Sequence, residues 1–249
     1  MIDLVLAAAA IASAQVASPA VDQLLPGTYS NEEQVYFARE AGKPVPPWSA
    51  LRITGAVPLF RMQRIDAFGA SIGPAQPFSV RETPEQVAIT TQSCTRDYAR
   101  VAAGLTIINQ TGACNEPAAA TTFIDRGLAM KMADGTLLEF QRSRSFKCWA
   151  SIPRKALKDG KPDWWFKAGL MLHDAGGRVV AMTDEVEPQS FTLRLRNVAW
   201  PSGNNQPSLV LYVHADDPDK AIGYAWADPA ARRVGINLRT VQASCSLAG

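Results

Sequence analysis

The stretch LLPGTYSNEEQV, Leu24 to Val35, is the most informative run in the chain. Within it, Ser30 followed three residues later by Glu33 forms a capping box, a pattern that starts helices. We therefore predict a short helix over residues 30–41, and acidic residues in its first turn suit the helix dipole. Gly42 supplies the stop, because glycine readily adopts the backbone conformation that ends a helix.

Beyond this helix, apolar and polar residues alternate with a period of two, which predicts β-strands. Asp134-Gly135 lies between two such runs and is typical of a hairpin turn, and residues 166–182 are interpreted as another hairpin. Residues 94–105 have helical spacing and are interpreted as a helix. About ten strands at near-regular spacing indicate an all-β barrel or sandwich, and periodicity does not choose between them. The alternation is clearest at Leu51 and Ile53, Phe78 and Val80, Val87 and Ile89, Phe191, Leu193 and Leu195, and Leu209, Leu211 and Val213.

Composition and charge exclude several classes of protein. Hydrophobic residues make up 47% of the 249 residues against 19% charged, which favours a packed globule over a disordered chain. The net charge is only +2, with 25 basic and 23 acidic residues interspersed. No basic surface for a phosphate backbone is indicated, so nucleic acid is not an expected partner.

The N-terminus resembles an export signal. Residues 4–11 are uninterruptedly apolar and Ala12-Ser13-Ala14 is a small-residue cleavage site, so residues 1–14 are predicted to be a signal peptide. Asp3 without Lys or Arg departs from the usual n-region, which leaves a mis-assigned start codon or a lipid-free anchor as alternatives. Residues 15–23 are then a tether and residues 24–249 a single β-barrel domain. No segment is long enough to span a bilayer, so we expect a periplasmic or secreted protein without a membrane span.

The cysteine count agrees with export. An even number of cysteines in an oxidising compartment predicts two disulfides, for which three pairings are open. A zinc site is the rival interpretation, but no C-x-x-C pair exists and the spacings are wide. The four residues are Cys94, Cys114, Cys148 and Cys245.

Sites for catalysis or metal binding are weakly indicated. The chain has two histidines, neither in a metal-binding spacing, and no G-x-S-x-G nucleophile elbow. His173 beside Asp174 is a candidate general base, although a hydrogen-bonded turn histidine is the favoured interpretation. His214 precedes three aspartates, for which an acidic turn is favoured over a calcium loop. No metal site or catalytic residue is therefore predicted; the aspartates are Asp216, Asp217 and Asp219.

Two arginine pairs are the candidate ligand-binding residues. Arg142 and Arg144 lie two residues apart on one predicted strand, and Arg194 and Arg196 repeat the arrangement on another, so each pair points to one face. In a filled sandwich that face is solvent-exposed. In a ligand barrel, inward guanidinium groups would bind carboxylates such as tetrapyrrole propionates.

Aromatic residues form a second candidate ligand surface. Residues 164–166 bring two tryptophans and a phenylalanine together, and other tryptophans lie near predicted strand ends. A flat apolar ligand would stack on such rings, whereas the more common role is to plug the ends of the core. The residues are Trp164, Trp165 and Phe166, with Trp48, Trp149, Trp200 and Trp226.

As a whole string, the stretch from residue 24 to 35 resembles the opening signature of the CpcT/CpeT family of phycobiliprotein chromophore lyases. The resemblance implies an antiparallel calycin or lipocalin-like β-barrel holding one small ligand. It further implies disulfides Cys114–Cys148 and Cys94–Cys245, because the family carries a Gly-Cys followed downstream by another Cys; this chain has Gly112-Ala113-Cys114 instead. The matching residues are Gly27, Thr28, Tyr29, Ser30, Asn31, Glu33 and Gln34.

The expected fold is therefore mostly β, an antiparallel calycin/lipocalin-like barrel with a short N-terminal helix. The resemblance implies binding of a linear tetrapyrrole or a similar planar carboxylate as the only cofactor-like group. In the family that binding serves bilin attachment to a protein cysteine, with the lyase positioning the ligand for the acceptor thiol. Export and disulfides point to a relative that has lost the reaction, since the family's substrates are cytosolic. A non-enzymatic envelope binding or interaction module is the alternative, with a protein acceptor or a second copy as partner.

Overall fold

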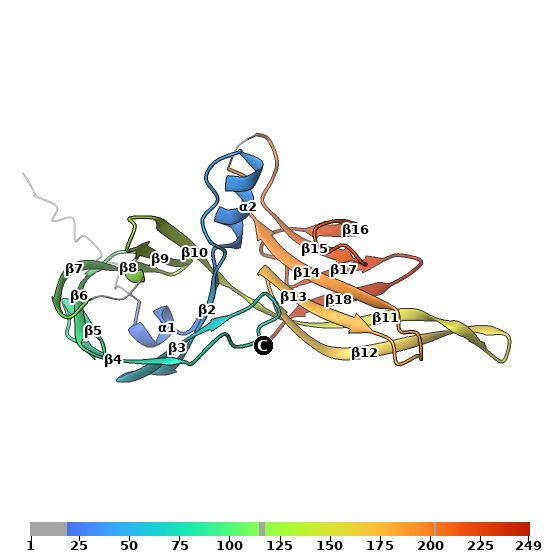
Figure 1. The fold of residues 1–249 in the computed structure, drawn as a ribbon, viewed down its shortest axis with the longest axis horizontal. Helices are drawn as coiled ribbons and strands as arrows, with labels where there is room; N and C mark the ends of the chain where they lie inside the picture. The colour runs from blue at the N-terminus through green and yellow to red at the C-terminus, as the bar shows by residue number, and fades with distance from the viewer. Residues whose placement is uncertain (1–18, 115–117, 202) are drawn as a thin grey trace, which may run out of the picture.

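The computed structural model describes residues 19–114, 118–201 and 203–249 (Figure 1). It is mostly β, with a closed antiparallel barrel and two short helices, α1 (Val21–Leu24) and α2 (Glu32–Glu40), which confirms the predicted fold class. The predicted signal peptide, residues 1–14, lies outside the described residues. Neither helix in the described part of the chain has the length and apolar character needed to cross a bilayer.

Ten strands close into the barrel in the order β1-β10-β9-β8-β7-β6-β5-β4-β3-β2. The short strand β1 pairs with both β10 and β2, so the informative N-terminal stretch supplies the closing strand. The strands are β1 (Gly27–Ser30), β2 (Ala50–Ala56), β3 (Leu59–Ile65), β4 (Gln76–Glu82), β5 (Gln86–Thr91), β6 (Cys94–Val101), β7 (Gly104–Gly112), β8 (Ala118–Ile124), β9 (Gly127–Met132) and β10 (Leu137–Ser143).

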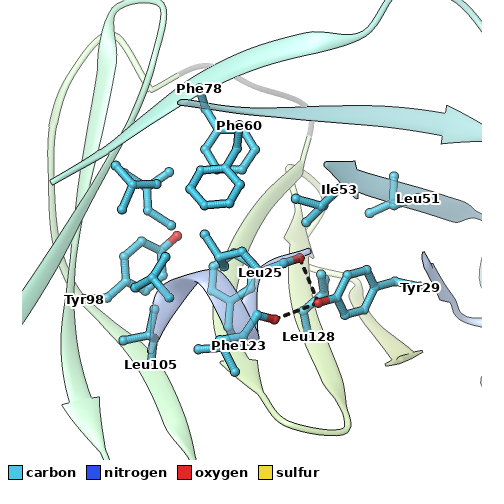
Figure 2. Packing of buried hydrophobic residues seen from close by; sticks show 14 of the residues in the cluster. Leu25, Tyr29, Leu51, Ile53, Phe60, Phe78, Tyr98, Leu105, Phe123 and Leu128 are labelled. Carbon is cyan, nitrogen blue, oxygen red and sulfur yellow. Dashed lines mark hydrogen bonds between the residues drawn. The ribbon is translucent and has the colours of Figure 1, made fainter. Parts of the chain in front are cut away.

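The barrel interior is filled by its own chain (Figure 2). Val21, Leu24 and Leu25 pack among the inward side chains of the strands, and the Tyr29 hydroxyl donates to the main-chain oxygens of Leu24 and Leu25 at 2.8 and 3.0 Å. Residues 21–23, expected in a tether, thus belong to α1, and Val21 is part of the core. The reason is that apolar residues at i, i+3 and i+4 form one face of a helical turn.

The chain after the barrel forms two four-stranded antiparallel sheets. Sheet I has the order β12-β11-β18-β17 and sheet II the order β13-β14-β15-β16. Their inner faces enclose a second hydrophobic core that shares no residue with the barrel core. The closed barrel therefore takes up residues 27–143 of the segment 24–249 that was expected to form it. The strands are β11 (Ser145–Lys158), β12 (Lys161–His173), β13 (Ala175–Met182), β14 (Ser190–Val198), β15 (Ser208–His214), β16 (Ala221–Ala227), β17 (Arg233–Asn237) and β18 (Gln242–Leu247).

The predicted N-terminal helix is confirmed as α2, with a different start. Ser30 belongs to β1, Asn31 occupies the N-cap position, and the Ser30 hydroxyl accepts a hydrogen bond from the Glu32 amide at 3.1 Å. Glu33 does not turn back to complete a capping box; its carboxylate accepts from the Ala199 amide at 2.6 Å. The helix terminus is therefore tied to a distant part of the chain.

Two other local predictions are wrong. Residues 94–105 form all of β6 and the start of β7, because Cys94, Arg96 and Tyr98 alternate as buried residues between partner strands on both sides. The predicted hairpin over residues 166–182 is absent, since β12 pairs with β11 in sheet I while β13 pairs with β14 in sheet II. The hairpin at Asp134-Gly135 is confirmed between β9 and β10.

All four cysteines are in disulfides, as predicted, but the implied pairing is wrong. The bonds are Cys94–Cys114 and Cys148–Cys245. Cys148 and Cys245 face each other directly on β11 and β18, while Cys94 starts β6 opposite Gly112, which brings Cys114 within reach. Register between neighbouring strands therefore decides both pairs. Two disulfides are compatible with an oxidising extracellular environment.

Candidate functional site

The first arginine pair lies where the barrel chain ends. Arg142 donates to the main-chain oxygens of Gln23 and Pro26 at 2.8 and 2.5 Å, and so holds the segment around α1. Arg144, between β10 and β11, forms an ion pair with Asp174 in which Nε and Oδ2 are 2.6 Å apart. Both guanidinium groups therefore have partners within the chain.

Asp174 is the centre of the junction between the barrel and the sheets. It is 2% exposed, and its carboxylate also accepts from the Arg144 amide at 2.7 Å. The Arg144 guanidinium and the Asn197 side-chain amide both donate to the main-chain oxygen of Pro229, at 2.7 and 3.0 Å. This network joins the end of the barrel to both sheets.

The second arginine pair lies beneath α2. Arg194 pairs with Glu32, whose carboxylate also accepts from the Trp48 indole at 2.7 Å. The Arg196 guanidinium carbon lies 3.9 Å from the centre of the Tyr36 ring, and Arg196 is only 3% exposed. The structure does not bring the two arginine pairs onto one common face. Each arginine has a structural contact, and a ligand role for them stays a prediction.

The two histidines are buried. Burial, followed by the charge of Arg52, lowers the pKa of His173 to about 4, so the ring is neutral near pH 7. Neither of its nitrogens has a hydrogen-bond partner among the described residues, unlike the turn histidine that was favoured. Burial lowers the pKa of His214 as well, with Arg178 and Arg194 adding to the effect.

The acidic segment after His214 is a turn. The Asp217 carboxylate accepts from the amides of Asp219 and Lys220 at 2.8 and 3.2 Å, which is the local pattern of an Asx turn. Within the described ranges, no group of three or more His, Cys, Asp or Glu side chains is placed to hold a metal ion.

The outer face of sheet II carries a groove of about 540 Å³. Its wall on β16 follows from the sequence AIGYAWA, in which small residues point into the core and large ones point outward. Ile222, Tyr224 and Trp226 are 49, 65 and 71% exposed. The groove is lined by Trp200, Asn204, Asn205, Gln206, Ser208, Val210, Tyr212, Tyr224 and Trp226.

Strand register places the aromatic rings of the groove side by side. Tyr212 lies opposite Tyr224, with ring centres 6.1 Å apart, and Val210 lies opposite Trp226. At the end of the groove the Trp200 ring meets Phe37 of α2 edge-on, with centres 5.8 Å apart and planes at 66°. The helix that follows β1 therefore supports one wall of a groove in the second half of the chain. In Figure 1, α2 lies beside the loop that follows β14.

Apart from Val210, the remaining described lining residues are polar, and none carries an acidic or basic side chain. Asn204, Asn205 and Gln206 supply amide groups, which both donate and accept hydrogen bonds, and the Ser208 hydroxyl donates to the Gln206 main-chain oxygen at 2.9 Å. Among the described lining residues there is no histidine, cysteine, carboxylate or lysine that could act as nucleophile or general base. The groove is therefore equipped for stacking and hydrogen bonding.

The predicted aromatic surface is divided between the two sheets. Trp165 is buried in the core, whereas Trp164 and Phe166 are exposed on sheet I, where Phe166 lies 5.9 Å from Trp149 between ring centres. Sequence reasoning named Trp200 and Trp226 but missed the tyrosines and amides of the groove. The alternation of small and aromatic residues over 221–227 is the signal that could have found them.

No family model, no curated protein and no solved structure matches this chain.

Proposed function

We propose that this protein is a non-enzymatic binding protein that holds a small ligand in the aromatic groove on sheet II. The observation that carries the proposal is the exposure of Tyr224 and Trp226 beside Tyr212 and Trp200 in one groove. Large exposed aromatic residues gathered in a concave site are typical of ligand binding, because stacking removes their apolar faces from water.

The barrel interior is not the proposed site. Apolar side chains from the strands and from residues 21–25 occupy it, and they would have to leave before a ligand entered. Many proteins of this architecture bind in the barrel mouth, but here the chain itself takes that place. The proposed location of action is periplasmic or secreted, supported by the two disulfides.

A linear tetrapyrrole, the ligand implied by the family resemblance, is the second candidate. The observation that favours it is the Arg194 guanidinium carbon, 5.9 Å from the centre of the Tyr212 ring that lines the groove. The pyrrole rings of the tetrapyrrole would stack on Tyr224 and Trp226, and one of its propionates would approach Arg194. Lyase activity on this scaffold would consist of positioning the ligand for an acceptor thiol.

The test compares binding to Trp226→Ala with binding to Phe166→Ala, a matched exposed aromatic residue on sheet I. Biliverdin and cellohexaose serve as probes, with absorption and calorimetry as readouts. We expect at least one probe to bind and its affinity to fall about tenfold in Trp226→Ala while Phe166→Ala is unchanged. Failure of both probes to bind, or equal loss in both variants, would refute the groove as the site.

A further inference from the structure

The chemistry of the groove narrows the class of ligand. We infer, building on the proposed function, that the groove takes a neutral saccharide whose rings stack on Tyr224 and Trp226. A pyranose has a face of C–H groups and a rim of hydroxyl groups, and flat aromatic rings beside side chains that donate and accept hydrogen bonds complement both.

The aromatic side of the groove matches the C–H face. Tyr224 and Trp226 are two residues apart on β16, so their side chains emerge on the same face about 6.6 Å apart along the strand. Tyr212 continues this surface onto β15. The rings form an open strip on the outside of a sheet, which leaves the outer hydroxyl groups of a bound sugar in water.

The polar side of the groove matches the hydroxyl rim. Asn204, Asn205 and Gln206 each offer an amide nitrogen and an amide oxygen, and a sugar hydroxyl both donates and accepts. A carboxylate would find no cation among the described lining residues and would have to give up water without a charged partner. Neutral amides therefore favour a neutral polyol over a planar dianion.

Two arginines on neighbouring strands of sheet II are already engaged within the chain. Arg194 pairs with Glu32, and the Arg178 guanidinium donates to the Pro218 main-chain oxygen at 3.3 Å. A ligand carboxylate would have to compete with the Glu32 carboxylate, which is itself held by Trp48. This arrangement weakens the case for an anionic ligand in the groove.

The groove is also pre-organised. Phe37 packs against the Trp200 ring and the Ser208 hydroxyl is bonded to the Gln206 main chain, so two walls have supporting contacts without a ligand. Pre-organisation lowers the entropy cost of binding, which matters for a shallow site with few contacts.

The experiment is isothermal calorimetry of the full chain with cellohexaose, maltohexaose and hexa-N-acetylchitohexaose, with biliverdin for comparison. We expect at least one oligosaccharide to bind, with affinity reduced about tenfold in Trp226→Ala and about fivefold in the double variant Asn204→Ala/Asn205→Ala. Phe166→Ala should bind as the unmodified protein does. High salt should leave the affinity unchanged, because a neutral ligand makes no ion pair.

The outcomes separate the ligand class from the site. If no oligosaccharide binds at millimolar concentration but biliverdin binds in a manner that depends on Trp226, the saccharide inference is overturned and the proposed function stands. If neither kind of probe binds, both are overturned. Oligosaccharide binding that survives Trp226→Ala, or that weakens sharply in high salt, also contradicts the inference. The substituted aromatic residues are exposed, so we expect the melting temperatures of the variants to be unchanged. Unchanged melting temperatures would exclude loss of folding as the cause of weaker binding.

Discussion

The barrel and the pair of sheets use their aromatic residues in opposite ways. In the barrel, Tyr29, Phe60 and Tyr98 point inward, and the lumen is filled with the help of the N-terminal segment. In sheet II, Tyr224 and Trp226 point outward, because the residues of β16 that pack toward the core are small and alternate with them. A closed barrel therefore does not by itself indicate a ligand in its interior, and here the open sheet offers the accessible rings.

The disulfides give the largest expected contrast between the two regions. Cys148–Cys245 closes 97 residues and Cys94–Cys114 closes 20, so chain entropy predicts stabilisation of about 5 and about 3 kcal/mol. We expect Cys148→Ala/Cys245→Ala to lower the free energy of unfolding more than Cys94→Ala/Cys114→Ala. Urea unfolding of the two double variants measures the difference, and equal losses would show that the loop lengths do not govern stability here.

A core substitution tests whether the barrel is filled. Leu25 is fully buried among the strands, so Leu25→Ala should cost about 3 kcal/mol through lost burial and the cavity left behind. Leu59, on the barrel but 66% exposed, is the matched control, and Leu59→Ala should change stability by less than about 0.5 kcal/mol. If Leu25→Ala left the free energy of unfolding nearly unchanged, the lumen would be open and the barrel interior would again be a candidate binding site.

The junction between the two regions should be sensitive to acid. The pKa of His173 falls from its ordinary 6.5 to about 4 on folding, so the unfolded chain binds more protons between these values. Stability is therefore complete above about pH 6.5 and decreases as the pH falls toward 4, by about 2 kcal/mol at pH 5. Melting temperatures recorded between pH 7 and pH 5 should decrease less in His173→Gln. An identical pH profile in that variant would contradict the burial of a neutral imidazole.

The sequence predicts the β-rich class because burial imposes a period of two on strands such as β4, β5 and β16. It does not predict where the barrel ends, since the same alternation serves the barrel and the two sheets. The disulfide pairing could not be predicted from the sequence either, because Cys148 and Cys245 are brought together only by the pairing of β11 with β18. For the groove, Trp226 was recognisable as an aromatic candidate, but Tyr212 is brought beside Tyr224 by strand register alone. Arg194 and Arg196 lie on one strand as the alternation predicts, whereas Arg144 lies between β10 and β11. The contacts of the arginines with Glu32, Tyr36 and Asp174 depend on tertiary packing.

The most direct test of the groove follows the indole N–H resonances of the six tryptophans by ¹H–¹⁵N NMR while cellohexaose, or the probe that binds best, is added. Trp200 and Trp226 report on the groove, buried Trp165 on the core, and Trp149 and Trp164 on sheet I. We predict saturable shifts of Trp226 and Trp200 with the other resonances unchanged. Shifts confined to Trp149 and Trp164, or binding without movement of the Trp226 resonance, would contradict the assignment of ligand binding to sheet II.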